Sequence, residues 1–264
     1  MADNRAIGVI DSGVGGLTVV KELKEQLAGE SIIYFGDNAN VPYGNKREEE
    51  IAQLTKNMID FLIDKDVKVI AVACNTISSL LDKYFTDYDI PIVSIIKPAA
   101  DYVVENGIKE VGVIATKFTV QSGAYDRFIR EGDESIRVIS EGSPNLAQII
   151  DSGNFTEVRG VIDLHMTNIL SKGDLKHIIL GCTHYPIVLD KFKERSPSIN
   201  FINPAYEQVR YINQLLEARN MKAQLDKSTF QIYTTGKEET YHKMLNLLSI
   251  DLPDNIIELS CQTI

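Results

Sequence analysis

Two cysteines stand where a thiol could act as an acid or a base. Cys74 and Cys182 each follow a short apolar run, VIAVA and HIILG, and each precedes amide or hydroxyl side chains. A thiol between a strand and a helix is partly exposed, and a helix N-terminus lowers its pKa from about 8.5, which favours the thiolate. A single free cysteine is more often a small buried hydrophobe. Two in similar polar settings favour chemistry, whereas Cys261 has no such setting and is expected to be structural.

The cysteines belong to an internal echo. Residues 72–76 (VACNT) are matched by residues 180–184 (LGCTH), with the cysteines 108 positions apart, and IGVI at 7–10 is matched by VGVI at 111–114. Matches at nearly one offset predict two similar α/β halves, with chance similarity of apolar strands as the alternative. In related halves, the two thiols would occupy equivalent strand ends and approach one ligand from opposite sides.

Two more polar clusters follow predicted strands, DSGVGG from Asp11 and NVPYG from Asn40 to Gly44. In open parallel sheets, ligands bind at the carboxyl ends of strands. The glycine loop is neither a dinucleotide fingerprint, whose third glycine would fall at Thr18, nor a P-loop, because no Gly-Lys-Ser/Thr follows. Its backbone N–H groups suit a carboxylate or a phosphate, and a plain turn is the alternative.

The histidines and the spacing of possible metal ligands give little evidence for a metal or cofactor site. Only His184 of the four histidines lies in a polar strand-end cluster. No C-x-x-C or H-x-x-x-H spacing occurs, so no metal site is predicted. Nothing specific marks a Schiff-base lysine for pyridoxal phosphate.

The elements that must position these residues alternate between short apolar runs and longer amphipathic stretches. This alternation predicts βαβ units and an α/β fold with mostly parallel sheets. The expected strands are Ala6–Ile10, Ile32–Phe35, Val67–Ala73, Pro91–Ile95, Val111–Ala115, Arg137–Ser140, His177–Gly181, Asn200–Asn203, Thr229–Thr235 and Ile256–Leu259. The clearest expected helices are Lys46–Lys65, which has an apolar stripe, and Glu238–Leu248.

Composition narrows the class of protein. The chain has 264 residues, 44% of them hydrophobic and 24% charged, with a net charge of −10. Such acidity disfavours binding to nucleic acid or to an anionic membrane surface, since both need clustered Lys and Arg. No apolar run approaches the roughly 18 residues of a membrane span, and no signal peptide is apparent. Three cysteines without an even framework favour a reducing cytoplasm.

Six segments together resemble a known family. IGVIDSGVGGLTV, YFGDNANVPYGNK, AVACNT, SIIKPA, GVIATKFTVQSGAY and ILGCTHYP, in this order over nearly the whole chain, are similar to bacterial glutamate racemases of the aspartate/glutamate racemase superfamily. The resemblance implies two pseudo-symmetric α/β domains with the active site in the cleft between them. The first would comprise residues 1–97 and 208–264, and the second residues 98–207.

The resemblance also implies an activity and a set of site residues. It implies interconversion of L- and D-glutamate without a cofactor, supplying D-glutamate to peptidoglycan and the cell wall, by a cytoplasmic homodimer. Its catalytic residues would be Cys74 and Cys182 as acid/base thiols, assisted by Asp11 and His184. Its substrate contacts would be Asp11, Ser12, Pro42, Tyr43, Gly44, Asn75, Thr76, Thr183 and His184.

Two positions depart from the family pattern. Ile77 follows CNT where the family usually has Ala, and an extra branched side chain there could narrow the site. Many members carry a Glu in the segment corresponding to residues 146–153, where the nearest acid here is the shorter Asp151. Neither change alters a proposed acid/base group.

Three other functions would use similar residues. An aspartate racemase would share the fold and the thiols but seat the side-chain carboxylate differently. A redox protein would bring its cysteines within bonding reach, with Cα atoms under about 7 Å apart. A non-catalytic binding protein would hold glutamate without changing its optical rotation.

Overall fold

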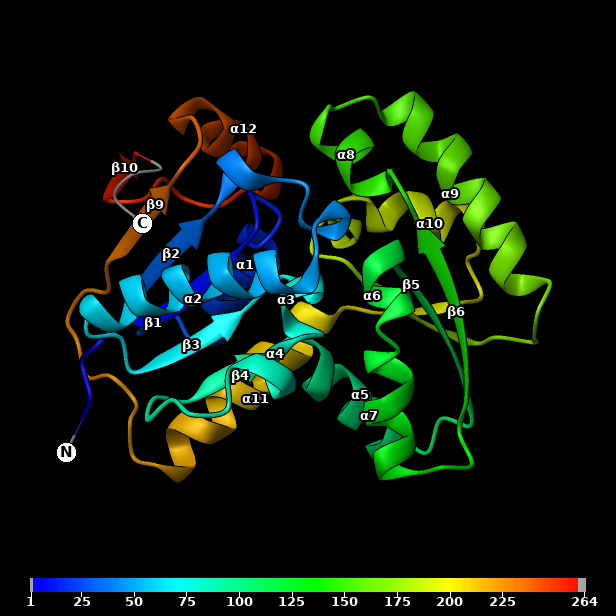
Figure 1. The fold of residues 1–264 in the computed structure, drawn as a ribbon, viewed down its shortest axis with the longest axis horizontal. Coiled ribbons are helices and arrows are strands. Elements are labelled where there is room, and N and C mark those ends of the chain that lie inside the picture. Colours follow the sequence, from blue (N-terminus) through cyan, green and yellow to red (C-terminus); the bar gives the residue numbers. More distant parts are fainter. Residues whose placement is uncertain (1, 261–264) are drawn as a thin grey trace.

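Two parallel β-sheets lie beside each other in the computed structural model, which describes residues 2–260 (Figure 1). The strands are β1 (Ile7–Asp11), β2 (Ile32–Gly36), β3 (Val69–Val72), β4 (Ile92–Ser94), β5 (Glu110–Thr116), β6 (Arg137–Ser143), β7 (His177–Gly181), β8 (Asn200–Ile202), β9 (Phe230–Thr234) and β10 (Asn255–Glu258). The α-helices are α1 (Leu17–Gln26), α2 (Glu48–Asp64), α3 (Asn75–Ser78), α4 (Leu81–Tyr84), α5 (Ile96–Glu105), α6 (Lys117–Gln121), α7 (Ala124–Gly132), α8 (Leu146–Asp151), α9 (Phe155–Leu170), α10 (Leu189–Arg195), α11 (Pro204–Ala218) and α12 (Glu238–Leu248). Short 3-10 helices span Asn38–Asn40, Tyr43–Asn45 and Tyr185–Val188.

The two sheets repeat one strand order. The first contains β2-β1-β3-β4 and the second β6-β5-β7-β8, and every described strand pair is parallel. Strand β5 therefore takes the place of β1, and β7 takes the place of β3. The echoed segments lie at equivalent positions, and the predicted fold class, two similar α/β units with parallel sheets, is confirmed.

Both ends of the chain build the first sheet. Strands β9 and β10 extend it beyond β2, so the orange and red C-terminal elements lie beside the blue N-terminal ones (Figure 1). The predicted division assigns residues 1–97 with 208–264 to the first domain and residues 98–207 to the second. Those boundaries stay a prediction.

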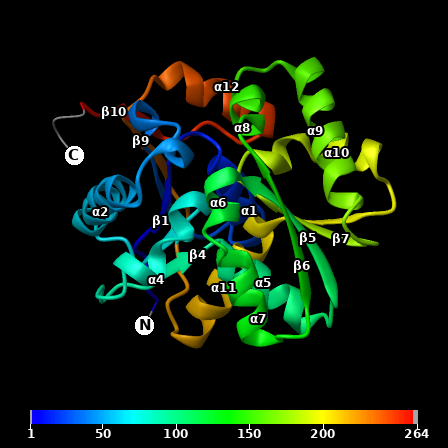
Figure 2. The same cartoon turned by 45° about the vertical axis from the view of Figure 1, so that its right-hand side comes forward.

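Successive side chains of the central strands point to opposite faces of each sheet, and this creates three apolar layers. On β1, Val9 packs with α1, α11 and α12, while Ile10 packs with α2 on the other face. On β5, Val113 joins the same cluster as Val9, whereas Ile114 faces α8, α9 and α10 on the outer side of the second sheet (Figure 2). The middle layer is thus shared by both sheets, which fixes one sheet against the other.

Most predicted elements are confirmed to within a few residues, and the differences have local causes. The strand expected at Arg137–Ser140 continues to Ser143, because β6 stays paired with β5 until Ser143 lies opposite Thr116. The helix expected at Lys46–Lys65 begins at Glu48, after the 3-10 turn Tyr43–Asn45. The expectation for Cys261 lies outside the described residues.

Candidate active site

A cavity of about 130 Å³ lies where the carboxyl ends of β1, β3, β5 and β7 converge. Parallel strands of both sheets thus deliver their following loops to one place. The lining residues are Ser12, Val41, Pro42, Tyr43, Gly44, Cys74, Asn75, Thr76, Thr116, Ala147, Gln148, Asp151, Cys182, Thr183 and His184. Every residue predicted for the site is therefore on the cavity wall except Asp11.

Cys74 occupies the first side of the cavity. The cysteine is free and 6% exposed, and its Sγ lies 3.5 Å from Ser12 Oγ. Burial, reinforced by the nearby Asp11 carboxylate, raises the pKa of the Cys74 thiol to about 12, against the hydrogen bonds from Ile77 N–H and Ser12 that lower it. The prediction of partly exposed thiols is wrong for both Cys74 and Cys182, which are buried, and the prediction of a lowered pKa is wrong for Cys74. Helix α3 has only 4 residues, so its dipole is too small to offset burial.

Asp11 lies next to the cavity wall rather than on it. Its Oδ1 accepts a 2.9 Å hydrogen bond from Gly13 N–H, and its Oδ2 accepts a 3.4 Å bond from Thr183 Oγ1. Burial raises the pKa of Asp11, while His184 and the backbone N–H groups of Gly13 and Gly16 act to lower it. The carboxyl group thus connects the strand end of β1 with the loop after β7.

Cys182 and His184 occupy the second side. The Cys182 thiol, 7% exposed, lies 3.8 Å from His184 Nδ1, and the other ring nitrogen, Nε2, lies 2.8 Å from Asp151 Oδ1. Burial of the ring lowers the pKa of His184, but Asp151 and Cys182 outweigh it and raise that pKa well above its usual value. The imidazole is therefore held as a cation between a thiol and a carboxylate.

The glycine loop provides close packing between the two sides. A Cβ on Gly15 would lie 2.5 Å from both His184 Cε1 and Thr183 Oγ1. Thr18, at the start of α1, donates through Oγ1 to the Thr183 carbonyl at 3.2 Å. The absence of a side chain at Gly15 lets the Cys182 loop approach β1, a role that the sequence pattern did not identify.

The loop after β2 forms another part of the wall. A cis peptide joins Val41 to Pro42, and Tyr43 is buried with its hydroxyl donating to Asp37 Oδ2 at 2.6 Å. The Tyr43 hydroxyl is therefore engaged by its own loop. The backbone of Pro42 and Gly44 lies beside it on the cavity wall.

Several lining residues were missed. Thr116 accepts a hydrogen bond from Thr119 N–H at 3.2 Å, which caps α6, and its Oγ1 lies 3.3 Å from Thr76 Oγ1. Thr116 stands 104 positions after Ser12, so the echo between β1 and β5 was a signal that could have found it. Val41, Ala147 and Gln148 carry no such signal. The sequence gives Asp151 no role in the site, whereas the structure pairs its carboxylate with His184.

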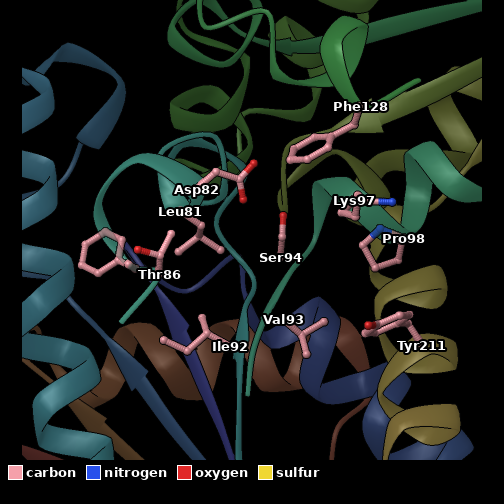
Figure 3. A pocket seen from close by; sticks show the side chains of 11 residues that line it. Leu81, Asp82, Thr86, Ile92, Val93, Ser94, Lys97, Pro98, Phe128 and Tyr211 are labelled. Carbon is pink, nitrogen blue, oxygen red and sulfur yellow. The ribbon is translucent and has the colours of Figure 1, made fainter. Parts of the chain in front are cut away.

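A second cavity of about 340 Å³ lies between α4, β4, α5, α7 and α11 (Figure 3). Its walls combine Phe85, Phe128 and Tyr211 with Asp82 and Lys97. Neither Cys74 nor Cys182 lines this second cavity.

Metal-ligand clusters and membrane-spanning helices are absent from the residues that the structure describes. Within residues 2–260, no group of three or more His, Cys, Asp or Glu side chains could hold a metal ion. No helix in the same range is long and apolar enough to cross a membrane.

The sequence matches known proteins over most of its length. Residues 7–212 match the family model described as Asp/Glu/Hydantoin racemase. The glutamate racemase of Limosilactobacillus reuteri (strain DSM 20016) is 34% identical over 238 residues, 89% of each chain. The glutamate racemase of Exiguobacterium sibiricum is 36% identical over 247 residues, 91% of each chain.

Solved structures agree with this similarity. A glutamate racemase isoform from Bacillus anthracis superposes with a TM-score of 0.92 at 30% identity, covering 98% of each chain. The glutamate racemase of Francisella tularensis in complex with D-glutamate superposes with a TM-score of 0.88 at 31% identity, covering 99% of this chain and 100% of the other.

Proposed function

Because this chain belongs to the Asp/Glu/Hydantoin racemase family and is an amino-acid racemase, we propose that it interconverts L- and D-glutamate with Cys74 and Cys182 as its two acid/base groups. One observation carries the proposal. The two cysteines, from equivalent strand ends of two related sheets, line the same cavity. A two-base racemase requires such a pair, one base for each face of Cα.

The proton balance explains why two similar groups suit the reaction. A thiolate takes the α-proton from one face and becomes a thiol, and the bonding electron pair remains on the carbanion. The opposite thiol then gives its proton to the other face and becomes the thiolate. Substrate and product are mirror images with equal free energies in water, so bases of similar strength serve both directions.

The charges around the thiols support one resting state. Cys74, buried and beside Asp11, is a neutral thiol at physiological pH. The His184 imidazole, whose pKa is raised well above its usual value, lies 3.8 Å from the Cys182 thiol. We infer that Cys74 begins as the acid of the pair in the unliganded enzyme. Each turnover exchanges these roles.

Acid/base catalysis alone is too weak for an unactivated α-proton. It contributes about 10²–10⁴-fold, or roughly 3–5 kcal/mol. Fixed donors must stabilise the charge that grows on the α-carboxylate, and water must be excluded. The hydroxyls of Ser12, Thr76 and Thr183 are on the cavity wall and can supply such donors.

The substrate assignment rests on the relatives. The similar proteins described above are glutamate racemases, and one of them was solved with D-glutamate. An aspartate racemase is the alternative, since an aspartate racemase homologue of Pyrococcus horikoshii shares the fold at a TM-score of 0.61 and 22% identity. A panel of L-glutamate and L-aspartate separates the two.

The test follows the optical rotation of purified protein by circular dichroism. With L- or D-glutamate and no added pyridoxal phosphate or metal, the signal should decay to zero, and dialysis against a chelator should not change the rate. In D₂O, the newly formed enantiomer should carry deuterium early in the reaction, while the remaining substrate stays mostly protiated. A product that keeps its protium would indicate one base serving both faces, and would contradict the two-thiol mechanism.

We propose three further properties on the resemblance alone. The product D-glutamate would enter peptidoglycan synthesis, the enzyme would act in the cytoplasm, and it would be a homodimer. Light scattering coupled to gel filtration measures the oligomeric state directly. Depletion of the protein in a bacterium that depends on it should be rescued by external D-glutamate.

A further inference from the structure

The side chain of Tyr125, in the second half of the molecule, contacts the loop that carries Cys74. It belongs to α7, is 3% exposed, and its hydroxyl donates a 2.7 Å hydrogen bond to Oδ1 of Asn75. Asn75 directly follows Cys74 and lines the cavity. Tyr125, which does not line the cavity, therefore binds Asn75, which does.

The hydrogen bond determines which way the Asn75 amide faces. Burial raises the pKa of Tyr125 far above its usual value, so the phenol stays protonated and keeps its donor. A buried O–H that donates to Oδ1 satisfies both atoms and leaves the NH₂ group as the free end of the amide. The Asn75 Nδ2 is buried and has no hydrogen-bond partner within residues 2–260. A buried amide donor without a partner costs free energy unless a ligand accepts from it.

The ring of Tyr125 also packs against the other catalytic loop. A Cβ on Gly181, the residue before Cys182, would lie 3.1 Å from Tyr125 Cε2. The same side chain thus contacts the strand end that carries Cys182 and binds the residue after Cys74. Its position depends on both sides of the cavity being in place.

We propose that Tyr125 is a positioning residue for racemisation, which orients the Asn75 amide so that its NH₂ group donates to a carboxylate of the bound amino acid. The inference rests on the proposed function, because it assumes an amino-acid substrate in this cavity. Tyr125 itself does not touch the substrate. It acts through Asn75 and favours the amide orientation that presents a donor over the one that presents the acceptor Oδ1.

The test is Tyr125→Phe, which keeps the ring and its packing and removes only the hydroxyl. A substrate contact present in both the ground state and the transition state affects KM and leaves kcat nearly unchanged. We expect KM for glutamate to rise about tenfold, the size of one ordinary hydrogen bond, with kcat within about twofold of wild type. Tyr88→Phe is the matched control, since its hydroxyl bonds only to Asp60, at 3.4 Å, among described residues, and Tyr88 does not line the cavity; it should change neither constant.

A double-mutant cycle separates positioning from general structural support. Asn75→Ala should raise KM, and adding Tyr125→Phe to that variant should raise it no further. A lower melting temperature without a change in KM, a loss in kcat alone, or additive effects in the double variant would each overturn the inference. Wild-type activity on glutamate with an unaffected Tyr125→Phe variant would leave the proposed function standing. If wild type racemises aspartate instead, only the substrate assignment fails, and the same cycle run with aspartate decides the role of Tyr125.

Discussion

The two sides of the cavity hold the same reactive group in different surroundings. Burial, reinforced by the nearby Asp11 carboxylate, raises the pKa of the Cys74 thiol to about 12. Cys182 lies 3.8 Å from His184, whose charge Asp151 maintains. Similar positions in related sheets therefore give opposite electrostatic settings.

The difference arises from the neighbours of the cysteines. At the offset of the echo, His184 stands where the first half has Thr76, and Ala115 stands where the first half has Asp11. The repeated strand order sets where the thiols lie, and the residues that differ beside them set the charges around each thiol. Two related sheets can thus be similar in backbone and still place different charges beside equivalent thiols.

Removing either thiol should have the largest effect. Cys74→Ala and Cys182→Ala should each reduce racemisation by at least about 10³-fold, because each variant lacks the acid/base group of one face. Each should still exchange the α-proton of one enantiomer with solvent, and the two variants should act on opposite enantiomers. Mass spectrometry of L- and D-glutamate incubated separately in D₂O measures this exchange.

The comparison fails if the two variants exchange the same enantiomer, since both thiols would then serve one face. Racemisation near the wild-type rate by either variant would remove that cysteine from the mechanism. Circular dichroism of the folded proteins, together with their melting temperatures, shows whether lost activity comes from unfolding.

Gly15→Ala should separate the two sides physically. The added methyl would overlap His184 and Thr183, so the Cys182 loop must move away from β1. A displacement of about 1 Å at a reacting centre costs on the order of 100-fold, and we expect kcat/KM to fall by that amount. Gly29→Ala is the control, because a Cβ there meets nothing within 4 Å. Equal activities of the two variants would show that close approach at Gly15 is unnecessary.

Asp151→Asn should lower the pKa of His184 and so affect only the Cys182 side of the cavity. Without the carboxylate, burial dominates and the pKa of His184 falls, so the imidazolium is lost at a lower pH. Asp151 is 44% exposed in its side chain, so solvent screens the pair and the loss should be modest, about tenfold in kcat/KM at pH 8. Since the cation exists below its pKa, the alkaline limb of the kcat/KM profile should move to lower pH.

A surface acid serves as the control for that experiment. Asp163 pairs with Arg195 on the same half of the molecule, and Asp163→Asn should leave the profile unchanged. An alkaline limb that stays in place in Asp151→Asn would mean that His184 does not need this carboxylate to remain charged.

Ser12→Ala should have the smallest effect, confined to the Cys74 side. The Ser12 hydroxyl lies 3.5 Å from Cys74 Sγ and helps to lower the thiol pKa, so its loss raises that pKa further. We expect kcat to fall about threefold, in keeping with one weak hydrogen bond. The primary isotope effect with α-deuterated glutamate should increase for the enantiomer whose proton Cys74 removes, and not for the other. Equal increases for both would show that Ser12 does not act on Cys74 alone.

Local sequence patterns predicted much of the fold. Apolar runs of four to seven residues separated by amphipathic stretches predicted the parallel strands, and His177–Gly181 and Glu238–Leu248 were placed at their observed bounds. These patterns suffice because burial of a parallel strand on both faces requires a continuous apolar run. The short helices α4, α6 and α8 were not predicted, since four to six residues contain too little periodicity to recognise.

The sequence by itself determined the two cysteines, their equivalence through the internal echo, and the polar residues that accompany them at strand ends. Only the tertiary structure decided the electrostatic surroundings of each thiol, because burial and charges from distant segments depend on how the chain packs. Asp151 comes from α8 and Asp11 from β1, yet they set the charges around Cys182 and Cys74 respectively. The role of Gly15 likewise depends on how closely the Cys182 loop packs against β1. These contacts form only when the two sheets share a core, so they cannot be predicted from the spacing of residues along the chain.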